Sequence, residues 1–203
     1  DGGQTLTLAS GSAATALQGE IGGNTALSAL TVNAAGAGTV EITNIGGVTG
    51  ATAIGNTSTG TLTLDGTAYS TAGTQTYTAA TGGGNIDITG AATFTTTNDD
   101  IVFATSGVDL ANNGTTTITT GTGAGVVTFG AAIEGNSATA PFNDLLVITS
   151  GEGNVTFSGA IGATNALGGL TVNSSAGDGD ITFTSTIGDA GNAGVVGTTA
   201  VGN

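Results

Sequence analysis

The chain has 203 residues, of which 39 are Gly and 42 are Thr, and it contains no Lys, Arg, His, Cys, Met or Trp, so that 14 Asp and Glu residues give a formal net charge of −14. Without Lys or Arg the chain cannot neutralise phosphates, and we expect neither a nucleic-acid partner nor an anionic membrane partner. The usual general bases, thiolate and amine nucleophiles and zinc ligands are also missing, so we expect no enzyme and no cofactor apart from a candidate calcium ion.

The composition also bears on disorder and location. A hydrophobic content of 38% and a positive mean hydropathy of +0.30 argue against a disordered chain. The sequence shows no basic segment followed by an apolar stretch and no run of 18 apolar residues, so we expect neither a signal peptide nor a transmembrane helix within it. An acidic, Thr-rich chain without Cys is typical of the extracellular space or cell surface.

The N-terminal part contains short segments in which apolar residues alternate with Thr or an acid, at residues 5–8, 39–42, 61–64 and 85–88. A period of two predicts β-strands with one apolar face. Gly, Asn and Ser between the segments suit tight corners. No segment keeps a period of 3.6, and β-branched Thr and Val disfavour helix, so the sequence predicts an all-β fold.

The middle of the chain is less regular. The apolar segments at 92–94, 101–103 and 108–110 do not keep the spacing found elsewhere. We therefore expect an irregular region at 54–110, in which the spacing does not define the coil boundaries.

The C-terminal part repeats. The motif [VI]-T-F-x-x-x-I occurs at 127–133, 155–161 and 181–187, and each copy follows an earlier short strand by eight or nine residues. The segments 24–33 and 164–173 share six of ten positions. We expect two short strands in each repeat.

Short strands that recur at intervals of roughly 20 to 28 residues predict a right-handed parallel β-solenoid, which forms one repeat domain over residues 1–203. At about 25 residues per coil the chain forms about eight coils. The alternative is a pair of antiparallel β-sandwich domains, which the long-range recurrence of one motif does not favour. Phe129, Phe157 and Phe183 occupy one motif position, so we expect them to stack inside the solenoid.

Several phrases of the sequence, LTVN, VTFSGAIGATNAL and TQTYTA, resemble the Gly/Thr-rich repeats of very large bacterial surface proteins of the filamentous-haemagglutinin and autotransporter-passenger type. The resemblance implies export and a role as a stalk, fibre or adhesin. It assigns no ligand and no functional residue, because repeats of this type have no fixed site.

Neither end of the expected solenoid carries a polar cap, and open β-edges recruit further strands. We expect the chain either to continue in a longer parent or to associate with copies of itself as a structural protein of an extracellular fibre or surface layer. The alternative is an adhesin whose central region binds a cell-surface or glycan ligand. The residues expected at the self-assembly contact are Thr5, Leu6, Thr7, Leu8, Val195, Val196 and Val201.

Two acidic clusters are candidate calcium sites, because Ca²⁺ prefers several oxygen ligands. The alternative, which we favour, is that these Asp and Asn side chains bond their own backbone at corners, since the sequence lacks the regular Gly- and Asp-containing array of calcium-binding β-solenoids. The candidate ligands are Asn98, Asp99, Asp100, Asp178 and Asp180.

Three other hypotheses are weaker. Alternating Thr residues suggest an ice-binding face, but four acids interrupt the outward positions: Glu41, Asp87, Asp109 and Asp180. Asp87 and Asp109 lie on comparable strands, as a glycoside hydrolase pair would require, yet exposed aromatic platforms are not expected. Glycosylation sequons occur at the frequency that composition alone predicts, which is about four; they lie at Asn56, Asn113, Asn154 and Asn173.

Overall fold

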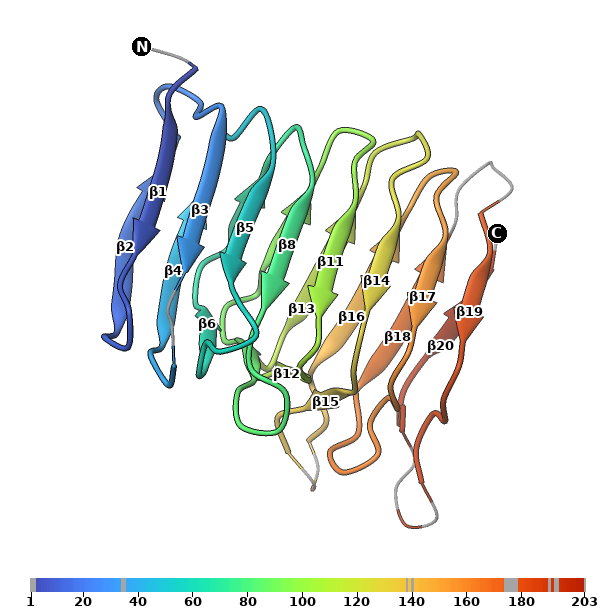
Figure 1. Ribbon diagram of the computed structural model, residues 1–203. Helices are drawn as coiled ribbons and strands as arrows, with labels where there is room; N and C mark the ends of the chain where they lie inside the picture. Colours follow the sequence, from blue (N-terminus) through green and yellow to red (C-terminus); the bar gives the residue numbers. More distant parts are fainter. Residues whose placement is uncertain are drawn as a thin grey trace.

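The computed structural model describes residues 3–33, 36–137, 139, 141–173, 179–189, 191 and 194–202. Every regular element in these ranges is a β-strand, and the strands stack as a right-handed parallel solenoid (Figure 1). This confirms the predicted fold class. The antiparallel sandwich is wrong, because every strand pair among these residues is parallel.

The solenoid has three faces. Face 1 is an eight-stranded sheet whose neighbours are one coil apart. Its strands, in spatial order, are β1 (Thr5–Ala9), β3 (Ala29–Asn33), β5 (Thr52–Gly55), β8 (Gln75–Thr78), β11 (Ile101–Ala104), β14 (Val127–Phe129), β17 (Val155–Phe157) and β19 (Ile181–Phe183).

A second, twelve-stranded sheet divides into two arms at its strand β4. One arm is face 2, with β6 (Leu62–Leu64), β9 (Ile86–Ile88), β12 (Val108–Leu110) and β15 (Ile133–Gly135). The other arm is face 3, with β7 (Ala68–Ser70), β10 (Thr93–Thr95), β13 (Thr115–Thr119), β16 (Leu145–Thr149), β18 (Gly169–Asn173) and β20 (Thr199–Val201). Two strands precede the division: β2 (Thr15–Ile21) and β4 (Val40–Ile45). Each of them extends along both face 2 and face 3.

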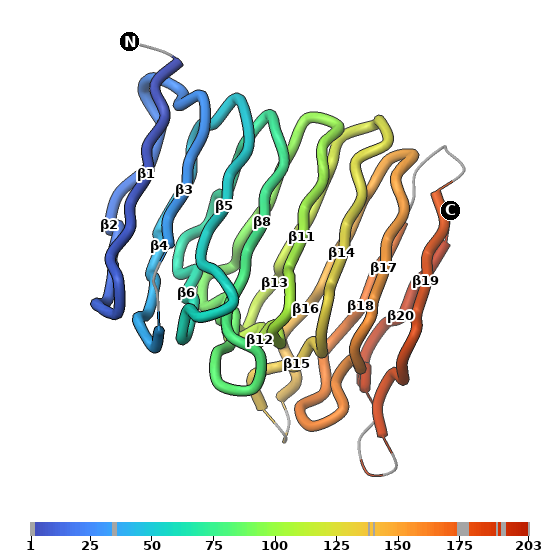
Figure 2. The backbone as a smooth tube through the Cα atoms, in the orientation of Figure 1, coloured from blue at the N-terminus to red at the C-terminus, as the bar shows by residue number. Residues whose placement is uncertain are grey.

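The first two coils therefore hold two strands each, as predicted, whereas a coil from β5 onward has a third side. Beyond β15, face 2 continues as single bridges from Ile133 to Ile161 and from Ile161 to Ile187. The eight strands of face 1 define about seven turns, one fewer than expected. Figure 2 shows the two chain ends at opposite ends of the stack.

The region 54–110, expected to be irregular, is in register in the structure: Ile54 pairs with Tyr77, and Tyr77 pairs with Phe103. Its sequence spacing differs because a short face 3 strand follows each face 2 strand. The coils are thus continuous through the middle of the stack.

Alternation along each strand separates the core from the surface. In β3, Leu30 and Val32 point inward and are fully buried, whereas Ala29, Thr31 and Asn33 are half-exposed. The same alternation in β4, β6 and β9 builds a narrow aliphatic core that runs the length of the stack. Equivalent residues of successive coils form columns, because the register is maintained from coil to coil.

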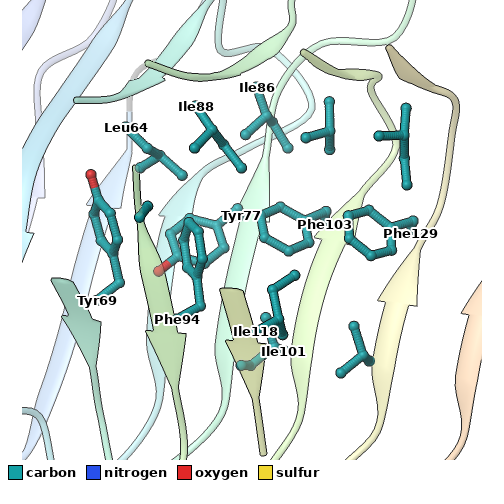
Figure 3. Close-up of a cluster of buried hydrophobic side chains, with 14 of the residues drawn as sticks. Leu64, Tyr69, Tyr77, Ile86, Ile88, Phe94, Ile101, Phe103, Ile118 and Phe129 are labelled. Atoms are coloured by element: carbon teal, nitrogen blue, oxygen red, sulfur yellow. The ribbon is translucent and has the colours of Figure 1, made fainter. Parts of the chain in front are cut away.

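Aromatic rings form one of these columns on face 1. Tyr77, Phe103, Phe129, Phe157 and Phe183 stack in turn, with ring centroids 4.8–5.4 Å apart (Figure 3 shows the first three). The predicted stack of the last three is confirmed. Rings in such offset stacks add about 0.5–1.5 kcal/mol per pair to the burial of their area.

A buried polar network lies beside the aromatic column. The Gln75 amide donates to the carbonyls of Tyr69 and Thr95 and to the hydroxyl of Thr71, and its carbonyl accepts from the Tyr77 hydroxyl. Burial raises the pKa of Tyr77 well above its usual value, so the hydroxyl stays a donor. Each polar atom of the Gln75 side chain is therefore satisfied, as burial requires.

Some glycines are required where adjacent coils meet. A Cβ built on Gly66 would lie 1.2 Å from the carbonyl oxygen of Thr43 in the preceding coil. One on Gly90 would lie 2.2 Å from the Gly66 carbonyl oxygen. These corners stack at backbone contact distance, which accounts for part of the high Gly content.

Candidate functional site

The open ends of the stack are the first candidate. In the described residues β1 pairs only with β3 and β2 only with β4, so each has one free edge. At the opposite end β19 pairs only with β17, and β20 only with β18. A free edge presents backbone N–H and C=O groups that can pair with another strand.

The side chains at these ends are incompletely buried core residues. The hydrophobic residues that pack against the core but are only partly buried belong to the first and last coils. They are Leu6, Leu8, Leu17, Ile21, Leu27, Ile181, Phe183 and Val195. Three of the four large hydrophobic residues that are exposed also lie in the last coil: Ile187 at 42%, Val196 at 51% and Val201 at 46%.

One coil further into the stack, the residues at the equivalent positions are fully buried. Leu30 and Val32 pair with Leu6 and Leu8, and both are fully buried. At the other end Val172, which pairs with Val201, is fully buried. Each end thus exposes a layer that the interior of the solenoid buries.

The residues predicted for self-assembly lie at these ends. Thr5–Leu8 are in the edge strand β1, Val201 is in the edge strand β20, and Val195 bridges to Leu167 beside the exposed Val196. The sequence interpretation missed Ile21 and Ile187. Ile187 was identifiable, because it is the last position of the [VI]-T-F-x-x-x-I motif.

The second candidate is a column of acids on face 2. Asp87, Asp109 and Glu134 pair directly on β9, β12 and β15, pointing away from the core. The Asn85 amide donates to Oδ2 of Asp109 (2.7 Å), whereas the buried Oδ1 of Asp87 has no hydrogen-bond partner. We call these three residues the acidic ladder.

Two residues of the acidic ladder, Asp87 and Asp109, have raised pKa values. Burial, followed by repulsion from Asp109, raises the pKa of Asp87 above its usual value. Burial raises the pKa of Asp109 most, the Asn85 hydrogen bond opposes it, and Glu134 adds repulsion. Folding therefore takes up protons: the resulting stability is complete below the unfolded-state pKa and is lost as the pH rises through the folded-state pKa.

Two carboxylates, Asp144 and the ladder residue Glu134, accept hydrogen bonds from backbone donors, which replace the absent cations. The buried Asp144 accepts from the N–H of Asn113 (2.8 Å) through Oδ1 and from the N–H of Asn136 (2.7 Å) through Oδ2. Oε2 of Glu134 accepts from the N–H groups of Thr164 and Asn165. Such hydrogen bonds to a charged acceptor are roughly twice as strong as neutral ones.

The first predicted calcium cluster is engaged in the same way. Asn98 accepts from the Gly123 N–H (2.6 Å), and Asp100 accepts from the Val126 N–H (2.8 Å). Both donors belong to the next coil, so these bonds link neighbouring coils and differ from the local backbone bonds that the sequence suggested. Asp99 lies between them.

The second cluster does not join the first. Asp180 precedes β19, and two strands of face 1, β14 and β17, separate β19 from β11, which Asp100 precedes. Asp178 lies outside the described residues. Within the described ranges no group of three or more acidic, His or Cys side chains could hold a metal ion. Calcium binding stays a prediction.

Outward threonines form columns on both face 1 and face 3; on face 1 Thr128, Thr156 and Thr182 follow one another. On face 3 Thr93 pairs with Thr117, but Val147 takes the next position of that column, followed by Thr171. Beside it Leu145 and Gly169 line a shallow depression of about 320 Å³ without charged lining residues. On face 3 the Thr array is interrupted by Val147, and on face 2 Glu41 and Asp87 lie on either side of Thr63, as the sequence suggested.

The sequon asparagines have mixed environments. Asn113 and Asn154 are exposed, whereas Asn56 and Asn173 are half-exposed. The side chain of Asn154 accepts from the N–H of Asp180 (2.8 Å), so it takes part in a contact between coils. Glycosylation stays a prediction.

No family model, curated protein or solved structure matches this chain. None of the elements in the described ranges is a helix long and apolar enough to cross a membrane.

Proposed function

We propose that the chain is a non-catalytic structural protein of an extracellular fibre or surface layer, and that it associates with copies of itself through the open edges of its solenoid. The observation that carries the proposal is the location of the incompletely buried core residues, which belong to the first and last coils. The extracellular setting is supported by composition and by the resemblance to bacterial surface repeats.

The energetics favour edge contact. Full burial of an exposed Val, Leu, Ile or Phe side chain is worth about 1.5–3 kcal/mol. Each backbone hydrogen bond formed across the joint adds about 0.5–1.5 kcal/mol. Because the sequence contains no Lys, Arg or His, side-chain ion pairs between copies cannot contribute.

A non-catalytic role is supported by the chemistry of the side chains. The two Tyr residues, Tyr69 and Tyr77, are buried, so neither offers a stacking platform for a sugar. The adhesin alternative rested on an irregular central region, and residues 54–110 are instead in register with their neighbours. We therefore propose the structural role ahead of an adhesin role.

Electron microscopy of purified protein tests the proposal. The unmodified chain is expected to form filaments, and Leu6→Asp with Leu8→Asp is expected to abolish them, because two charges would enter the joint. The matched control is Thr7→Asp with Ala9→Asp, which places the same charges on the outward positions of β1. Filaments of equal length from both double variants, or none from the unmodified chain, would contradict the proposal.

A further inference from the structure

We infer that the copies join head to tail in one register, so that β19 and β20 of one copy pair in parallel with β1 and β2 of the next. The inference rests on the proposed self-association and adds its polarity and its residue pairing. It makes the partner of each end the opposite end of a second copy.

Face 1 provides the first argument. One inward column begins at Leu6, passes through Leu30, and ends at Ile181. The neighbouring inward column begins at Leu8 and ends at Phe183, the last ring of the aromatic stack. In a head-to-tail joint Ile181 meets Leu6 and Phe183 meets Leu8, and both columns continue without interruption.

The other faces agree with the same register. On face 2 the column that begins at Thr15 ends at Ile187 through its bridges. On face 3 the column that begins at Ile21 ends at Val201. The joint would cover the exposed Ile187 and Val201 with the first coil of the next copy, so all three faces close together.

The outward positions carry no conflict of charge. In this register Asp180 lies opposite Thr5. Glu20 lies opposite Ala200, because one outward column of each copy begins at Glu20 and ends at Ala200. No two described carboxylates oppose each other across the joint. Like charges placed directly opposite would destabilise a strand pair.

Joints between like ends of two copies do not continue these columns. Turning one copy to bring like ends together reverses its strands, so the pairing at the joint becomes antiparallel, unlike every pair among the described residues. A turn that lays face 1 over face 1 also places face 2 of one copy over face 3 of the other, so the inward columns of these faces no longer continue from copy to copy.

Cysteine cross-linking tests polarity and register, because the chain contains no Cys of its own. Thr7 and Thr182 are exposed outward residues that lie opposite each other only in the head-to-tail joint. Within one copy they are seven strand spacings apart, roughly 34 Å. A disulfide needs Cα atoms about 4.4–6.8 Å apart, so an intramolecular bond cannot form.

The double variant Thr7→Cys with Thr182→Cys, oxidised with diamide, is expected to give a ladder of covalent oligomers on a non-reducing gel. Each single variant should give no ladder. The matched register control is Thr5→Cys with Thr182→Cys, whose Cα atoms are offset by two residues, and it should cross-link at least tenfold less.

Three results would overturn the inference while filaments persist: dimers from Thr7→Cys alone, which indicate joined N-terminal ends; dimers from Thr182→Cys alone, which indicate joined C-terminal ends; and equal cross-linking of the offset pair. Filaments without any cross-link would overturn it as well. Failure of the unmodified chain to assemble would instead overturn the proposed function, and the inference with it.

Discussion

Truncation of Phe157 to Ala tests the assignment of the aromatic column to the core. The ring is 1% exposed and lies between Phe129 and Phe183, with centroids 5.4 and 4.8 Å away and planes within 5°. Removal of a buried Phe side chain costs about 3–5 kcal/mol, including the cavity that it leaves. Both neighbouring rings belong to strands held in register by backbone ladders, so the cavity cannot close easily.

The free energy of unfolding from urea denaturation measures this cost, with Thr156→Ala as the matched control on the outward side of the same strand. We expect the control to change stability by no more than about 0.5 kcal/mol. Phe183→Ala should cost less than Phe157→Ala, because Phe183 is half-exposed in the last coil. A loss below about 1 kcal/mol for Phe157→Ala would refute the inward assignment.

Four further results are expected. The melting temperature should rise as the pH falls from 7 toward 4, because Asp87 and Asp109 have raised folded-state pKa values. Asp109→Asn should raise the melting temperature at pH 7 and reduce its further rise in acid. A melting temperature that falls steadily as the pH falls would contradict this assignment. Asp144→Asn should cost about 1–3 kcal/mol in urea, because the amide has one acceptor for two backbone donors; no loss would show that the donors find other partners. Gly66→Ala should lower the free energy of unfolding by about 1–3 kcal/mol, because the added methyl group forces adjacent coils apart. Gly83→Ala should leave the free energy of unfolding nearly unchanged, because the space around Gly83 is open. Equal effects of the two substitutions would refute the close contact at Gly66. Filaments should persist in 1 M NaCl, since charge pairs are absent from the joint, and their dissolution would indicate an ionic contact.

Much of the fold followed from local pattern. Alternation in segments such as 39–42 and 181–183 identified strands and their inward faces, and the repeated Phe position identified the ring stack. The third strand of the middle coils was not assigned to a face of its own: β7 was not recognised, and β10, seen as the apolar segment 92–94, did not fit a coil of two strands. A repeat with two strands per coil has no place for this third strand, so the apparent irregularity of 54–110 reflected an extra corner in each of these coils.

The candidate sites also differ in how far the sequence predicted them. The edge strand β1 was predictable, because an alternating segment begins near the start of the sequence. The acidic ladder was predicted only in part: the sequence placed Asp87 and Asp109 on comparable strands, but Glu134 joins them only through the register of β12 and β15. The donors to Asp144 come from other coils, so its burial could not be inferred from neighbouring residues.

The central claim is end-to-end self-association, and small-angle X-ray scattering at increasing protein concentration tests it most directly. The account predicts that the particle lengthens with concentration while its cross-sectional radius of gyration stays that of a single solenoid. A particle that stays monomeric throughout, or one whose cross-section widens as it grows, would contradict the account.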